Sequence, residues 1–345
     1  MEELTQPNQE SKPQTEPEQN ITAPTTQLQK DLQQLSHEVL SIRKEINKII
    51  IGQDHMITLL LNGLLCGGHV LIEGVPGIAK TLAAKMLART LNIKFSRIQF
   101  TPDLMPSDVT GTSVFNAKTA EFNFHKGPVH SNIVLIDEVN RSPAKTQAAL
   151  FEVMEEQQIS VDGTTYKMDL PFMVLATQNP IEQEGTYRLP EAQLDRFLFR
   201  VKIQYPSAQE EFAILQRFKE DFTLKQTEDV KPVVNGSQIM KYRHLVEQVY
   251  IKDELLNYIA QIIAATRNHS DLFLGASPRA SLAVMRSSKA LAAMSGREFV
   301  TPDDIRFVTA PVLNHRIILA PEKEMEGVEI EDVINQVVES IEVPR

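Results

Sequence analysis

Residues 74–81 of the chain read Gly-Val-Pro-Gly-Ile-Ala-Lys-Thr, and they lie between an apolar run at 70–72 and a helix-forming stretch that begins with Leu82. A glycine-bearing loop between a strand and a helix directs backbone N–H groups, and the N-terminus of the helix, at an anion. In such a loop Lys80 would contact the β- and γ-phosphates of a nucleotide, and the Thr81 hydroxyl would bind Mg²⁺. The segment therefore predicts a phosphate-binding loop.

A second polar group follows the apolar run at 133–136, where Asp137 and Glu138 are consecutive. Two acids at the end of a buried strand can take different parts in one nucleotide site. Asp137 can hold the magnesium shell, and Glu138 can polarise an attacking water. The acids and the phosphate loop together predict a nucleoside triphosphatase.

One residue of the loop departs from the usual pattern, because Ala79 stands before the lysine where glycine is common. If this position needs a positive φ, alanine costs roughly 1–2 kcal/mol. The alternative interpretation is a plain Pro/Gly turn between a buried strand and a helix. The acidic pair after a second apolar strand favours the phosphate loop over that turn.

Three further polar residues are candidates for the same site. Asn179 follows the predicted strand at 172–177, so its amide could orient the water, although Asn-Pro is also a common turn opener. Arg196 ends a short predicted helix, where it could instead stabilise the helix dipole. Arg279 follows a proline in the first turn of a predicted helix, where it opposes the dipole and a triphosphate would favour it.

The composition limits the classes of protein that fit. The chain has 345 residues, enough for two domains of about 100–200 residues each, and 42% of its residues are hydrophobic. A net charge of −10 argues against nucleic acid as a partner. The single Cys66 excludes an intrachain disulfide and a cysteine-rich zinc site. Because no apolar run approaches 18 residues and the N-terminus has no basic and apolar leader, we expect a soluble, cytoplasmic protein without membrane insertion.

The pattern along the chain predicts three parts. Residues 1–27 are rich in Gln, Pro, Thr and Glu and have no aromatic residue, which predicts a disordered tail. Within 28–206, helical periodicity starts near Leu28, and strands and helices alternate from Val70, which predicts an α/β fold with a mostly parallel sheet and helices on both faces. Between 207 and 345 the strand signals disappear, which predicts an all-helical domain. The expected strands are 70–73, 93–100, 133–136, 172–177 and 199–204, and the expected helices are 80–91, 144–157, 191–196, 237–249, 253–268, 278–294 and 301–313.

Two stretches interrupt the alternation. Residues 101–127 are rich in Pro, Gly and Asn, and residues 158–170 are expected to form a hairpin that turns at Asp162 and Gly163. Long inserts in a compact α/β unit are usually functional. The acids Glu152, Glu155 and Glu156 are predicted to lie on a solvated helix face.

Four stretches resemble those of the MoxR family of AAA+ ATPases: the loop at 74–81, Leu-Ile-Asp-Glu-Val-Asn-Arg, Ala-Thr-Gln-Asn-Pro and Leu-Pro-Glu-Ala-Gln-Leu-Asp-Arg-Phe. The resemblance covers about 28–344 and includes the alanine before the lysine. It implies an AAA+ parallel-sheet P-loop core, with a helix-2 insert at 101–127 and a hairpin before sensor 1 at 158–170 that line a ring pore. It also implies a C-terminal all-helical lid domain.

The resemblance also assigns roles to individual residues. Lys80 and Thr81 become Walker A, Asp137 and Glu138 Walker B, Asn179 sensor 1, Arg196 the arginine finger and Arg279 sensor 2. Arg188 is an alternative finger, and Arg279 could act in cis or in trans. The implied nucleotide contacts are Ile51, Gly52, Gln53, Val75, Pro76, Gly77, Ile78, Ala79, Lys80, Thr81 and Leu82, with Thr81 and Asp137 at the metal.

The family further implies ATP and Mg²⁺ as cofactors and a homo-oligomeric, hexameric ring. Such a ring would remodel partner proteins or assist their metal loading, and the partners often carry a von Willebrand factor A domain. A magnesium-chelatase-like ATPase subunit and a DNA-translocating motor are alternatives from the same clade, and the acidic balance argues against the motor. A module that binds ATP without hydrolysis is a further alternative, against which Glu138 argues.

Overall fold

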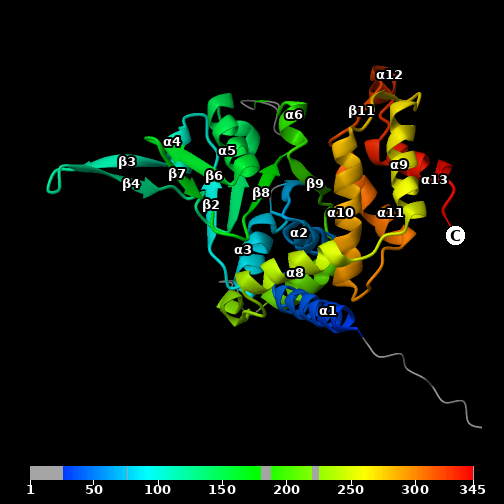
Figure 1. The fold of residues 1–345 in the computed structure, drawn as a ribbon, viewed down its shortest axis with the longest axis horizontal. Coiled ribbons are helices and arrows are strands. Elements are labelled where there is room, and N and C mark those ends of the chain that lie inside the picture. The colour runs from blue at the N-terminus through cyan, green and yellow to red at the C-terminus, as the bar shows by residue number, and fades with distance from the viewer. Residues whose placement is uncertain (1–25, 76, 180–186, 188, 220–224, 345) are drawn as a thin grey trace, which may run out of the picture.

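A five-stranded sheet forms the centre of the molecule (Figure 1). The computed structural model describes residues 26–75, 77–179, 187, 189–219 and 225–344. The sheet order is β2-β5-β8-β1-β9, and all neighbouring strands are parallel. Its strands are β1 (His69–Glu73), β2 (Phe95–Gln99), β5 (Ile133–Asp137), β8 (Met173–Gln178) and β9 (Phe197–Lys202). Because the strands are parallel, their carboxyl ends all lie along one side of the sheet, the carboxyl edge. Their amino ends all lie along the opposite side, the amino edge.

Helices surround the sheet and build the C-terminal region. They are α1 (Gln27–Ile46), α2 (Asp54–Cys66), α3 (Lys80–Thr90), α5 (Ala144–Glu156), α6 (Glu191–Leu194), α7 (Ala208–Phe218), α8 (Gly236–Gln248), α9 (Asp253–Arg267), α10 (Pro278–Met294), α11 (Pro302–Leu313), α12 (Pro321–Met325) and α13 (Ile330–Ser340). Two 3₁₀ turns, η1 (Val139–Arg141) and η2 (Lys225–Asp229), connect them.

The central strands are covered on both faces. Successive side chains of a strand point to opposite sides, so Val134 and Val174 enter the core that contains α5, whereas Ile133 and Met173 enter the core that contains α1 and α2. Such two-sided burial is the reason that these strands read as continuous apolar runs. The predicted α/β fold with a parallel sheet is confirmed.

Several boundaries differ from the sequence prediction. Thr26 caps α1, which begins at Gln27, so the last two residues of the predicted tail 1–27 belong to a helix cap and a helix. Residues 1–25 lie outside the described residues. Helix α2 was not predicted, because the residues from Met56 to Leu65 are all buried and the stretch therefore lacks an amphipathic pattern.

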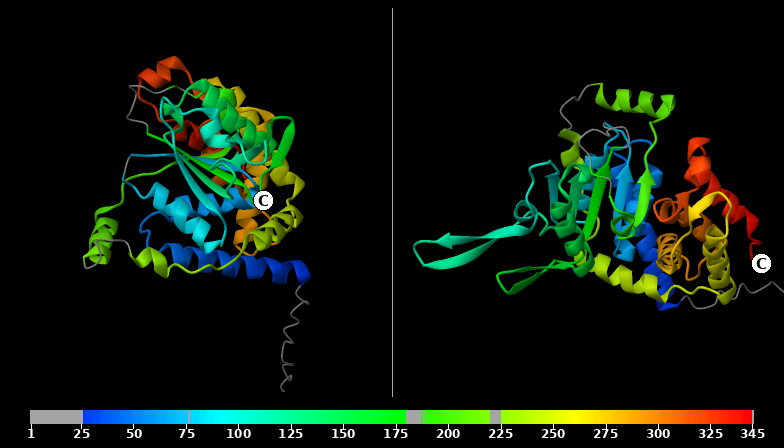
Figure 2. Two further views of the ribbon diagram at one scale, coloured as in Figure 1. Left: turned by 90° about the vertical axis from the view of Figure 1, so that its left-hand side faces the viewer. Right: turned by 90° about the horizontal axis from the view of Figure 1, so that it is seen from above.

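Both inserts contain antiparallel hairpins. The first holds the short helix α4 (Pro106–Thr110) and the strands β3 (Gly111–Asn116) and β4 (Glu121–Lys126). The second pairs β6 (Gln158–Val161) with β7 (Thr164–Lys167) and turns at Asp162 and Gly163, as the sequence predicts. Both hairpins project from the body on the same side (Figure 2). Phe124 of the first stacks on Tyr166 of the second, with ring centroids 4.3 Å apart.

The C-terminal region is mainly helical. Helices α9, α10, α11 and α13 pack against one another beside the edge strand β9 (Figure 1). The region also contains a two-stranded sheet of β10 (Leu272–Leu274) and β11 (Ile318–Leu319), which the prediction of an all-helical domain did not include. Helix α8 packs on α1 and α2 as well as on α10. The domain boundary at 206 stays a prediction.

Candidate nucleotide site

The predicted phosphate loop connects β1 to α3. Gly77 has a φ of 88° and Ala79 a φ of 62°, so Ala79 adopts the left-handed conformation whose cost the sequence analysis considered. Ala79 is the N-cap of α3, and Lys80 is the first helical residue. Pro76, one of the predicted nucleotide contacts, lies outside the described residues. The loop thus places the N-terminus of an eleven-residue helix where an anion can bind.

The Lys80 ammonium is held inside the loop. Its Nζ donates to the carbonyl oxygen of Gly74 at 2.5 Å. Burial lowers the pKa of Lys80, and the nearby carboxylates of Asp137, Glu138 and Glu73 oppose that shift. The ammonium therefore lies between a loop carbonyl and a group of acids, in the position from which it can meet a phosphate.

The two acids lie at the carboxyl end of β5. Asp137 Oδ2 accepts from Arg97 Nε at 2.6 Å, and Oδ1 accepts from the Thr177 hydroxyl at 3.2 Å. Glu138 Oε2 accepts from Gln99 Nε2 at 2.7 Å, and the Glu138 backbone N–H donates to the Thr177 hydroxyl. Both acids are therefore oriented by the neighbouring strands β2 and β8.

A hollow of about 370 Å³ separates the loop from the acids. Eight of the predicted site residues line it together: Gly77, Ala79, Lys80, Thr81, Leu82, Asp137, Glu138 and Asn179. Hydroxyl and carboxylate oxygens are the ligands that Mg²⁺ takes from a protein when phosphates and water complete its octahedron. Within the described part of the chain no cluster of three or more His, Cys, Asp or Glu side chains could hold a metal alone. The donor set fits magnesium brought in with a nucleotide.

A second cavity, of about 660 Å³, continues from the loop. It shares Gly77, Ala79 and Leu82 with the hollow and is lined mainly by apolar side chains, among them Ile51, Ile78, Ile214, Leu215 and Phe218. Gln53 also lines it. Gly52 instead lines a neighbouring cavity, and its φ is 74°. An apolar cavity beside a phosphate loop can hold the flat base of a nucleotide.

Arg196 and Arg279 lie elsewhere. Arg196 immediately precedes β9, whose first residue Phe197 pairs with His69, the first residue of β1. The phosphate loop follows the last residue of β1, about 13 Å away at 3.3 Å per residue. Arg279 is ion-paired with Asp195 at 3.6 Å, beside Arg196. Both arginines thus lie toward the amino edge of the sheet, away from the loop of their own chain.

Acids connect the arginines at this edge. Glu155 at the end of α5 lies 3.5 Å from Arg196 and 3.8 Å from Arg279. Asp195 lies 2.7 Å from Arg316, whose side chain is only 5% exposed. The predicted solvated face of α5 is exposed, but Glu155 also pairs with both arginines, a contact that was not predicted. Arg188, the alternative finger, lies outside the described residues.

Four further contributors to the site were not predicted from the sequence. Arg97 and Gln99 on β2 bind the two acids, and Tyr205 and α7 close the apolar cavity. The signal for the first two was available, because an arginine and a glutamine two residues apart in a strand must lie on the same face. The signal for α7 was the capping box of Ser207 and Glu210.

Comparisons with known proteins agree with this fold. Residues 69–199 match the model of the ATPase family associated with various cellular activities (AAA), and residues 264–337 match the AAA lid domain. A crystal structure of a protein from Cytophaga hutchinsonii superposes with a TM-score of 0.85 at 41% identity, over 92% of this chain and 98% of that one. The chain is thus built as an AAA+ ATPase with a lid.

Two curated relatives narrow the class. YeaC of Bacillus subtilis (strain 168) is 44% identical over 87% of this chain and 93% of its own length. Chaperone MoxR1 of Mycobacterium tuberculosis (strain ATCC 25618 / H37Rv) is 42% identical over 87% of this chain and 81% of its own length. The chain belongs to the MoxR family of AAA+ ATPases. None of its described helices is both long enough and apolar enough to span a membrane.

Proposed function

We propose that the protein binds ATP with Mg²⁺ and hydrolyses it to ADP and phosphate. The observation that carries this proposal is the convergence of Lys80, Thr81, Asp137, Glu138 and Asn179 on one hollow that opens into an apolar cavity. In this arrangement the base would occupy the apolar cavity, and the phosphates would lie against the loop and the N-terminus of α3.

The residues divide the reaction among them. Glu138 accepts a proton from the attacking water, whose oxygen bonds to the γ-phosphorus as the bond to the β,γ-bridging oxygen breaks. Asn179 fixes the position of that water, and Lys80 compensates the charge that develops on the leaving diphosphate. Magnesium, when bound, supplies a further counter-charge for the β- and γ-phosphates, with Thr81 and Asp137 as its protein ligands.

The position of the arginines supports a composite site. Arg196 and Arg279 lie on the opposite edge from their own phosphate loop, so they would serve the site of a neighbouring copy of the chain. Arg196 would then be the arginine finger and Arg279 a second phosphate contact, both in trans. Such a requirement is met by a homo-oligomeric ring, for which we propose six subunits.

The proposal for how the hydrolysis energy is used rests on the relatives of the chain and on its hairpins. A relative at 42% identity is named a chaperone. The first hairpin exposes Val114, Phe115 and Phe122, which suits contact with a client protein. We propose remodelling or metal loading of partner proteins, including ones with a von Willebrand factor A domain.

Steady-state ATPase assays test the proposed reaction. Glu138→Gln should retain ATP binding while turnover falls by at least about 100-fold, because the group that takes the proton is lost. The matched control is Glu152→Gln, which makes the same substitution at an exposed position of α5 and should hydrolyse ATP normally. Equal rates in the wild type and Glu138→Gln would contradict the proposed role of Glu138.

A further inference from the structure

A buried carboxylate lies directly beneath the phosphate loop. Glu73 is the last residue of β1, and Gly74 follows it as the first residue of the loop. The Glu73 side chain is only 10% exposed. An uncompensated negative charge at this depth would repel the phosphates of a nucleotide, because water screens it little.

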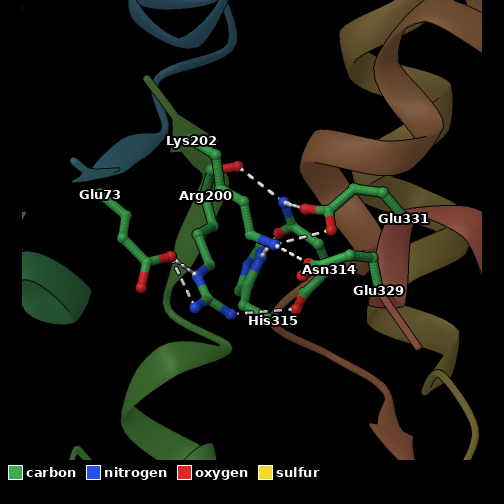
Figure 3. A network of polar contacts seen from close by, with 7 residues as sticks. All are labelled: Glu73, Arg200, Lys202, Asn314, His315, Glu329 and Glu331. Atoms are coloured by element: carbon green, nitrogen blue, oxygen red, sulfur yellow. Dashed lines mark hydrogen bonds and ion pairs between the residues drawn. The ribbon is translucent and has the colours of Figure 1, made fainter. Parts of the chain in front are cut away.

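Arg200 on the adjacent strand β9 compensates this charge. Its Nε and Nη2 both donate to Glu73 Oε2, at 2.7 and 2.6 Å (Figure 3). The Arg200 side chain is itself three-quarters buried, with 25% exposed. Two short charge-assisted hydrogen bonds in a poorly hydrated place make this a much stronger pair than a surface ion pair.

The lid holds the other side of the guanidinium. Arg200 Nη1 donates to the carbonyl oxygen of Asn314, the C-cap residue of α11, at 3.2 Å. Asn314 Nδ2 in turn donates to the backbone carbonyl of Arg200 at 3.0 Å, and it lies 3.4 Å from Glu331 of α13 (Figure 3). The Arg200 side chain therefore connects Glu73, which directly precedes the phosphate loop, with Asn314 at the end of α11. Asn314 extends this connection to Glu331 of α13.

We propose that Arg200 is a positioning residue for ATP, which neutralises Glu73 beneath the phosphate loop while Asn314 of the lid holds it in place. This inference rests on the proposed function, since it concerns the binding of the same nucleotide. It assigns a role in nucleotide affinity to a residue outside the hollow that the phosphates would occupy.

The strand supplies a matched control. Lys202 lies two residues further along β9 and is the register partner of Glu73, yet its ammonium pairs with Glu329 and Glu331 instead, at 3.4 and 2.7 Å. Lys202→Gln and Arg200→Gln therefore remove the same charge from the same strand. Only Arg200→Gln leaves Glu73 unpaired.

Ligands of different charge distinguish compensation of the Glu73 charge by Arg200 from a purely structural role of Arg200. An exposed Glu73 charge repels ATP more than ADP and does not repel neutral adenosine, whereas a distorted site binds all three more weakly. Titration calorimetry with MgATP, MgADP and adenosine would measure the dissociation constants. Thermal unfolding of each variant would confirm the folded state.

For Arg200→Gln we expect MgATP binding weakened about tenfold, MgADP binding about threefold and adenosine binding less than about twofold. Glu73→Gln should bind MgATP at least as tightly as the wild type. The double variant Glu73→Gln/Arg200→Gln should recover affinity to within about threefold, and Lys202→Gln should change it less than about twofold.

Several results would overturn the role of Arg200 alone: normal MgATP affinity in Arg200→Gln, the same loss for all three ligands, no recovery in the double variant, or an equal loss in Lys202→Gln. A wild-type protein that binds no MgATP would instead overturn the proposed function, and the role of Arg200 with it.

Discussion

The two edges of the central sheet carry different arrangements of charge. At the carboxyl edge each acid has a cation or an amide donor of its own: Glu73 pairs with Arg200, Asp137 with Arg97, and Glu138 with Gln99 and Arg141. At the amino edge Arg196, Arg279 and Arg316 share the two carboxylates of Glu155 and Asp195. The first edge carries the carboxylates that we propose for the metal and the water, and the second carries three arginines for two carboxylates.

Under the proposed function, one copy of the chain carries two unlike half-sites. The carboxyl edge can hold a nucleotide and its metal, and the amino edge can present arginine to a phosphate. They are separated by the length of a strand, so neither edge can complete the other within one chain. If the protein assembles as proposed, the carboxyl edge of one copy meets the amino edge of the next.

The largest effect expected from this comparison concerns Arg196. Arg196→Ala should reduce the rate of ATP hydrolysis about 10³-fold or more, as arginine fingers do in other nucleotide hydrolases, with ATP affinity unchanged. A mixture of Arg196→Ala and Glu138→Gln subunits should recover part of the activity. In mixed assemblies some intact Glu138 sites face a neighbour that still carries Arg196. No recovery, together with a lower unfolding midpoint for Arg196→Ala, would indicate a purely structural arginine.

A smaller effect is expected at the carboxyl edge from Lys80. Lys80→Ala should weaken ATP binding on the order of 10- to 100-fold, because a charge-assisted contact to phosphate is lost in a partly dry site. Lys85→Ala is the matched control, since Lys85 lies on the same helix but is exposed. Fluorescence titration with an ATP analogue measures both. Equal affinity in the wild type and Lys80→Ala would contradict the assignment of the phosphate loop.

Two arginines of the amino edge are expected to differ in their contribution to stability. Arg316 is 5% exposed and also donates to the backbone oxygens of Phe197, Leu198 and Val312, whereas Arg279 is 63% exposed. Arg316→Gln should lower the free energy of unfolding by about 3 kcal/mol, because the buried network loses its charge. Arg279→Gln should lower it by less than about 1 kcal/mol. Urea unfolding of the two variants makes the comparison, and equal losses would contradict it.

The smallest effect is expected from removing the N-terminal segment, which belongs to neither edge of the sheet. Removal of residues 1–23 should leave the unfolding midpoint and the ATPase rate unchanged, because a segment of this composition contributes few buried contacts. Differential scanning calorimetry of the shortened and full chains measures the midpoint. A decrease of several degrees would mean that the segment packs on the protein.

The sequence was sufficient for the parts of the fold and site that depend on local chemistry. The order of apolar strands and the two polar clusters predicted the sheet, the loop and the convergence of Lys80 with Asp137 and Glu138. Ala79 is a further local feature of this kind, because the positive φ that the sequence suggested for it is present. Such features depend on a few neighbouring residues, and the parallel sheet then brings the strand ends together.

Features that depend on distant partners were not predictable in this way. Glu155 reads as one acid of a solvated helix face, and only the fold places it beside Arg196 and Arg279. Glu73 and Arg200 are 127 residues apart in the chain, and nothing in their local sequences indicates a pair. Helix α2 was missed for a different reason, since burial on all sides removes the periodicity that reveals a helix.

Helix α5 also gives the molecule a mechanical connection. The helix starts shortly after Glu138 and ends where β6 begins, so thirteen residues, or about 20 Å of rigid rod, join the acid to the second hairpin. The stacked rings of Phe124 and Tyr166 then join that hairpin to the first. If Glu138 activates the attacking water as proposed, a movement of α5 caused by hydrolysis would be transmitted to both hairpins together.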